Sequence, residues 1–145
     1  MKRIVLSLLP LLLFCGQAIA EGGLDGFLSN LNVQARADMG GFSAKVSAQF
    51  GVPFQQVEAV LKTVDTPADA FMVFQLGQMA HRQPEVVVQS YKTHKGKGWG
   101  VIAKELGIKP GSREFHALKN GDLVFGDTRA DSPGKGKGQG KGHKK

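Results

Sequence analysis

The chemistry-bearing residues of this sequence are most concentrated in one short stretch, His94-Lys95-Gly96-Lys97-Gly98-Trp99-Gly100. In such a stretch glycines expose backbone N–H groups to an anion, lysines supply positive charge, and an indole ring can stack on a sugar ring or a base. The same residues also fit a solvated loop in which Trp99, the only tryptophan, packs into the core at the start of the next helix. We expect the packing role, and we keep Lys95, Lys97 and Trp99 as candidate contacts for an anionic partner. The stretch lacks the Gly-x-x-x-x-Gly-Lys-Ser/Thr spacing of a nucleotide-binding P-loop.

Four histidines lie at positions 81, 94, 116 and 143. No two of them have the three- or four-residue spacing that gathers metal ligands on one face of a helix, so the sequence predicts neither a metal site nor a cofactor. His94 and His116, with the lysines around them, are instead a candidate site for a small ligand or for acid–base chemistry. The sequence shows no glycine-flanked serine nucleophile, no placed pair of carboxylates and no metal-hydrolase helix. We therefore do not predict an enzyme, and a ligand-binding or catalytic role for these histidines stays an alternative.

The first twenty residues have the three parts of a cleavable secretory signal. Lys2 and Arg3 precede an apolar run over residues 4–14, and Ala18-Ile19-Ala20 forms the exit. We expect cleavage after Ala20 and a periplasmic or secreted protein. The apolar run is shorter than the roughly 20 residues of a membrane-spanning helix, and no later segment approaches that length, so we expect no transmembrane segment in the mature chain. Cys15 leaves lipidation open as an alternative, although the bulky Phe14 before it fits that processing site badly.

The formal charge of +7 is unevenly distributed. Residues 21–132 hold 12 basic and 12 acidic residues, whereas residues 133–145 hold five lysines and no acid. Glycine alternates with polar residues in that tail, which has nothing apolar to bury, so we predict that it is disordered. It can bind anionic polymers by salt-sensitive attraction or simply aid solubility. The candidate contacts in the tail are Lys135, Lys137, Lys141, Lys144 and Lys145.

Apolar residues between positions 42 and 120 recur at helical spacing and are interrupted by glycines, which predicts an all-α fold. We expect a compact bundle of about five to six short helices, with a capping box at Thr66-Pro67-Ala68-Asp69 opening a central, buried helix. Residues 21–41 fit either a helix or a short strand and form an N-terminal segment of uncertain structure. The expected helical domain covers residues 42–121, and residues 122–132 form an extended linker. The predicted helices cover residues 42–50, 53–64, 67–81, from 84 to the glycines at 96 and 98, 99–106 and 112–120.

Two stretches, 47–61 and 103–118, share the order small residue, large apolar residue, glycine, β-branched residue and second helix. This order resembles the helix-turn-helix of DNA-binding proteins, where a glycine permits the tight turn. Reading DNA requires polar or basic side chains on the second helix, and neither stretch is convincingly basic there. We therefore expect ordinary helical corners and no sequence-specific nucleic acid partner, with nucleic-acid binding through the corners as a second alternative.

The block GWGVIAKELGIKPGS over residues 98–112, followed by FHALK over 115–119, resembles a block found in small exported bacterial proteins that often end in Gly/Lys-rich tails. The resemblance implies export and a helical fold, and it implies no activity, cofactor or substrate. Together these features predict an exported helical binding or interaction protein of the cell envelope. Its cationic tail would associate with an anionic component or with an envelope protein. The sequence does not indicate an oligomeric state.

Overall fold

The computed structural model describes residues 22–126. The predicted signal peptide, Cys15, and the predicted tail with its five lysines and His143 lie outside the described residues. Within residues 22–126 the chain forms seven α-helices and no strand, which confirms the all-α prediction. The helices are α1 (Leu24–Ala37), α2 (Met39–Phe50), α3 (Phe54–Leu61), α4 (Pro67–Ala80), α5 (Pro84–Thr93), α6 (Trp99–Glu105) and α7 (Arg113–Asn120). No helix in this part of the chain is both long and apolar enough to cross a bilayer.

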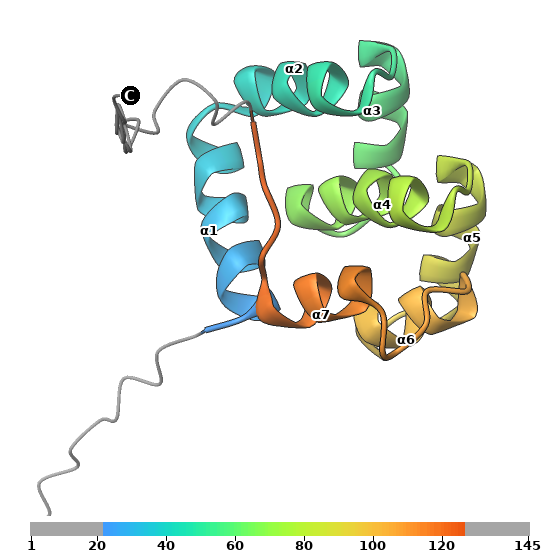
Figure 1. Cartoon of the computed structure of the whole chain (residues 1–145). Coiled ribbons are helices and arrows are strands. Elements are labelled where there is room, and N and C mark those ends of the chain that lie inside the picture. Colours follow the sequence, from blue (N-terminus) through green and yellow to red (C-terminus); the bar gives the residue numbers. More distant parts are fainter. Residues whose placement is uncertain (1–21, 127–145) are drawn as a thin grey trace, which may run out of the picture.

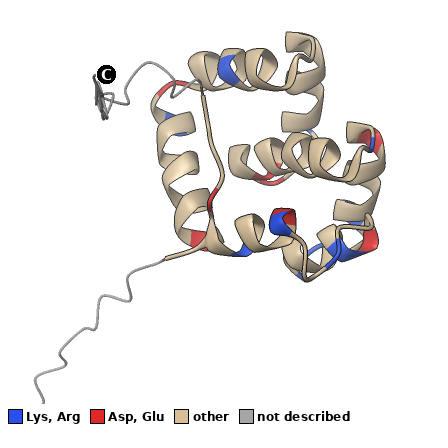
Figure 2. Ribbon diagram, viewed as in Figure 1, with Lys and Arg blue, Asp and Glu red and all other residues tan. Residues whose placement is uncertain are grey.

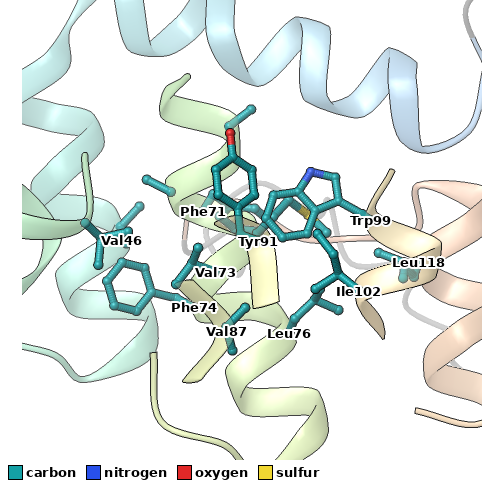
Figure 3. Packing of buried hydrophobic residues seen from close by; sticks show 14 of the residues in the cluster. Val46, Phe71, Val73, Phe74, Leu76, Val87, Tyr91, Trp99, Ile102 and Leu118 are labelled. Atoms are coloured by element: carbon teal, nitrogen blue, oxygen red, sulfur yellow. The ribbon is translucent and has the colours of Figure 1, made fainter. Parts of the chain in front are cut away.

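Helix α4 runs through the middle of the molecule, and the other helices surround it (Figure 1). Its N-terminus is held by the predicted capping box, in which Thr66 Oγ1 accepts from the Asp69 amide at 3.2 Å and Asp69 Oδ2 accepts from the Thr66 amide at 3.1 Å. Phe71 is fully buried and packs against three other phenylalanine rings from α1, α2 and the C-terminal segment. Figure 3 shows other buried side chains that pack around α4, among them Val46 of α2, Val87 of α5 and Leu118 of α7.

The helical unit begins at Leu24, and not at residue 42 as predicted, because α1 is part of the core. Leu31 and Ala35 are buried, and the side chain of Asn32 accepts a hydrogen bond from the Ala68 amide at the start of α4, at 2.9 Å. Val33 between them is 65% exposed. The apparent alternation over residues 31–35 is therefore one turn of an amphipathic helix, and the strand alternative is wrong. This additional helix takes the number of helices above the predicted five to six.

Four helices end in the same way, with a backbone amide that donates to the carbonyl five residues earlier, in the last turn. The bonds are Val52 N to Ser47 O at 3.1 Å, Arg82 N to Gly77 O at 2.8 Å, Ile108 N to Ala103 O at 2.9 Å and Asp122 N to Ala117 O at 2.9 Å. Glycine occupies the left-handed position at three of these ends, at Gly51, Gly107 and Gly121. The predicted corners after α2 and α6 are thus confirmed as glycine-dependent helix ends.

After α7 the chain runs in an extended path beside α1 and reaches α2 (Figure 1). Gln49 fixes this segment by donating to the Val124 carbonyl at 2.8 Å and accepting from the Gly126 amide at 2.9 Å. Phe125 stacks on Phe42 with ring centroids 5.2 Å apart. The described part of the predicted linker, residues 122–126, is therefore a packed strap across the helices.

Candidate functional site

Trp99 is the first residue of α6 and is positioned by packing against α5. Only 7% of the residue is exposed, and its ring stacks on Tyr91 with centroids 5.4 Å apart and planes inclined by 24° (Figure 3). Gly98 before it has φ of 86°, a conformation that favours glycine. One face of the indole is therefore occupied by Tyr91, and Trp99 lines two hollows of the surface.

The larger of these hollows is a groove of about 700 Å³ formed by α6, α7 and the start of α1. Lys97, Lys104 and Lys119 line it, and all three are exposed. We call it the lysine groove. Its other lining residues are Leu24, Asp25, Trp99, Gly100, Val101, Pro110, Phe115, His116 and Asn120. In Figure 2 several basic segments lie on α6, α7 and the loop before α6, at the lower edge of the view.

The three lysines reach this groove from different parts of the chain because of the corner between α6 and α7. Lys97 precedes α6, Lys104 lies in its last turn, and Lys119 lies in the last turn of α7. Lys104 Nζ lies 5.9 Å from the centroid of the Phe115 ring, which offers it a cation–π contact. None of the three forms an ion pair with another residue of the described range, and Asp25 is the single acid among the lining residues.

The smaller hollow, of about 320 Å³, is lined by Tyr91, His94, Lys95 and two aspartates, and we call it the tyrosine cavity. Tyr91 donates to Asp65 Oδ2 at 3.0 Å, and Lys95 Nζ lies 2.9 Å from Asp65 Oδ1. These bonds from Lys95 and Tyr91 lower the pKa of the Asp65 carboxyl. Burial, with the nearby carboxylates, raises the pKa of Tyr91 to about 12. Lys95 is thus engaged by an internal partner, in contrast to the three lysines of the groove.

His94 is held by the carboxylate of Glu105, which joins α5 to α6. His94 Nδ1 lies 2.7 Å from Glu105 Oε2, and Ser90 donates its hydroxyl to the same oxygen at 2.6 Å. In a serine–histidine–acid relay the imidazole lies between the hydroxyl and the carboxylate. Here the carboxylate lies between the other two groups, so this arrangement positions side chains and does not activate Ser90.

The sequence-predicted site residues divide between the two hollows. Lys97 and His116 lie in the lysine groove, whereas His94 and Lys95 lie in the tyrosine cavity, and Trp99 borders both. Of the hollows described for residues 22–126, none contains both His94 and His116. Lys104 and Lys119 were missed, and the only signal for them was the excess of basic residues between positions 82 and 119. No group of three or more His, Cys, Asp or Glu side chains suited to a metal ion occurs within residues 22–126.

Comparison with protein-family models, curated proteins and solved structures finds no match.

Proposed function

We propose that this chain is an exported protein of the cell envelope that binds an anionic, phosphate- or carboxylate-bearing polymer in the lysine groove. The observation that carries the proposal is the convergence of Lys97, Lys104 and Lys119 on one groove that contains a single acid. Three ammonium groups around one hollow repel each other and give the fold no ion pair within the described residues. A ligand with several negative charges relieves that repulsion.

The size of each contact favours a polymer over a small anion. An exposed lysine contributes on the order of 0.2–1 kcal/mol through one ion pair, so three such contacts hold a single small anion weakly. A chain of anionic groups engages all three lysines and continues along the surface. Its binding weakens steeply with salt because each neutralised charge releases a counterion.

The predicted cationic tail supplies a second set of contacts to the same kind of ligand. Its five lysines carry no balancing acid in residues 133–145. A polymer bound in the groove keeps its neighbouring segments close to the tail lysines. The effective concentration of these segments is therefore high, and the two sets of contacts together bind the polymer more tightly than either set alone. Envelope polymers rich in phosphate or carboxylate have the required chemistry.

The proposal is tested with polyphosphate as the probe and with the fluorescence of Trp99 as the signal, because Trp99 is the only tryptophan and borders the groove. The test variant carries Lys97→Gln, Lys104→Gln and Lys119→Gln. The matched control carries Lys62→Gln, Lys92→Gln and Lys109→Gln, which removes the same charge from three exposed positions that line none of the hollows described here.

We expect the groove variant to bind polyphosphate more weakly than the control. We also expect its plot of log affinity against log salt concentration to be less steep by about two, because each of the three lost contacts contributes roughly 0.7 to the slope. Equal binding by the groove variant and the control would overturn the proposed site. Deleting residues 133–145 is expected to weaken binding while leaving the helical circular dichroism unchanged. Unaltered affinity after this deletion would remove the tail from the mechanism.

A further inference from the structure

A different hollow, of about 420 Å³, lies where the corner after α2 meets the corner after α4. Its lining residues are Phe50, Val52, Phe74, Gly77, Gln78, His81, Arg82, Gln83 and Pro84. Phe50 and Phe74 form its aromatic side, with ring centroids 5.9 Å apart and planes inclined by 25°, and Phe74 is only 3% exposed. Phe50 is half-buried and in turn meets Phe71 edge-on at 5.5 Å. We call this hollow the corner pocket.

The polar side of the corner pocket has only basic and neutral groups. His81 and Arg82 are both exposed, and neither forms an ion pair with a residue of the described range. Gln78 and Gln83 are the other polar lining residues, and none of the lining residues is acidic. An aromatic surface beside a guanidinium and an imidazole is complementary to a flat ring that carries a carboxylate.

His81 also has a backbone conformation that is unfavourable for residues other than glycine. Its φ of 53° and ψ of 44° are left-handed, and it is the only non-glycine residue with positive φ among residues 22–126. The three other helices that end with the same hydrogen bond use glycine at this position. A glycine at position 81 would relieve the backbone, so the imidazole is present despite the local geometry.

We infer that the corner pocket binds a small aromatic carboxylate. The ring lies against the half-buried Phe50, and the carboxylate accepts hydrogen bonds from the exposed His81 and Arg82. This site is independent of the lysine groove, with which it shares no lining residue. The ligand also differs from the anionic polymer proposed for the lysine groove, because the corner pocket offers an aromatic side chain to an apolar ring and basic side chains to a single carboxylate.

The experiment uses nitrogen-labelled protein and follows backbone amide resonances during titration with naphthoate. Naphthamide, which has the same ring and no charge, is the matched ligand. The variants are His81→Gly, which removes the imidazole and relieves the left-handed backbone, and Arg82→Gln, which removes the guanidinium. Arg113→Gln is the control, because Arg113 is exposed and lines none of the hollows described here.

We expect naphthoate to shift the amides of Gly77, His81 and Arg82, and naphthamide to bind about tenfold more weakly, as the loss of a charge-assisted contact implies. Arg82→Gln is expected to weaken naphthoate binding by a similar factor, of about ten. His81→Gly is expected to raise the melting temperature and yet weaken binding, which separates a binding role from a folding role. Equal affinity for naphthoate and naphthamide, shifts confined to α6 and α7, or unchanged binding by both variants would each overturn the inference.

Discussion

The Tyr91 hydroxyl is bonded to Asp65 through both its hydrogen and its oxygen, and this joins α5 to the turn before α4. The hydroxyl donates to Asp65 Oδ2 at 3.0 Å and accepts from the Asp65 amide at 3.3 Å. Tyr91 is 8% exposed, so water compensates poorly for the loss of these bonds. The same ring stacks on Trp99, and the tyrosine therefore links the capping turn of α4 to the start of α6.

Replacing Tyr91 with phenylalanine is expected to lower the free energy of unfolding by about 1–2 kcal/mol, because the ring stays packed while the Asp65 amide loses a partner. Urea denaturation followed by circular dichroism measures the change. Lys95→Gln is the comparison, since it removes an ion pair whose side chains are 61% and 54% exposed, and its effect is expected to be smaller. A larger loss in Lys95→Gln than in Tyr91→Phe would contradict this assignment.

The raised pKa of Tyr91 predicts a loss of stability in alkali. The unfolded tyrosine ionises near pH 10 and the folded one near 12, so the folded state holds its proton over that interval. Its contribution is fully present below pH 10 and is lost as the pH rises through 12. Phenolate absorbance reports this titration directly, because the chain has one tyrosine. A midpoint near 10 in the folded protein would show that the tyrosine cavity does not protect the hydroxyl.

Asp65 makes the stability of the fold depend on pH in the opposite direction from Tyr91, because its contribution is lost in acid. Hydrogen bonds from Lys95 and Tyr91 lower the pKa of its carboxyl below the ordinary value of 3.8. The stabilisation is therefore present above that value and is lost as the pH falls through the lowered pKa. We expect Asp65→Asn to have a lower free energy of unfolding than the wild type at neutral pH. We also expect its free energy of unfolding to fall less than that of the wild type as the pH is lowered. Parallel acid-unfolding curves for the two proteins would contradict this.

Phe125 is predicted to hold the strap onto the helices. It stacks on Phe42 and meets Phe71 edge-on, with ring centroids 5.9 Å apart. Phe125→Ala is expected to cost about 2–3 kcal/mol, somewhat less than the loss of a fully buried ring, because Phe125 is half-buried. Val124→Ala, at a neighbouring position that is 55% exposed, is the control and is expected to change stability little. Thermal unfolding of the two variants measures the difference, and equal melting temperatures would show that the strap is not anchored by this ring.

The sequence predicts the helix boundaries well wherever a local signal specifies them. Thr66 and Asp69 form the predicted capping box, and Gly51, Gly107 and Gly121 end their helices in the left-handed conformation. Helix α1 could not be assigned because Leu31 and Ala35 fit a helical face and an alternating strand equally well. Its helical state is stabilised by contacts with α4, 36 residues away in the case of Asn32 and Ala68.

The candidate site is predictable only in part, for the same reason. Lys95 and Lys97 are two residues apart and look equivalent in the sequence, yet Lys95 pairs with Asp65, 30 residues earlier, while Lys97 lines the groove. Lys104 and Lys119 join Lys97 because of the angle at the corner between α6 and α7. No local pattern encodes that angle, so the grouping of the three lysines follows only from the packed structure.

The two buried serines, Ser43 and Ser90, each donate a hydrogen bond to a glutamate 15 residues later. The pair of Ser43 and Glu58 allows the energy of such a hydrogen bond to be measured. Ser43 is fully buried and donates to Glu58 Oε1 at 2.9 Å. Glu58→Ala leaves a buried hydroxyl without its acceptor and is expected to cost about 1–3 kcal/mol, whereas Ser43→Ala leaves a half-buried carboxylate that water reaches and is expected to cost about 1 kcal/mol or less. The double variant is expected to be no less stable than Glu58→Ala, because the unsatisfied hydroxyl is then gone. A double-mutant cycle measured by urea denaturation checks this, and strictly additive losses would show that the two side chains do not interact in solution.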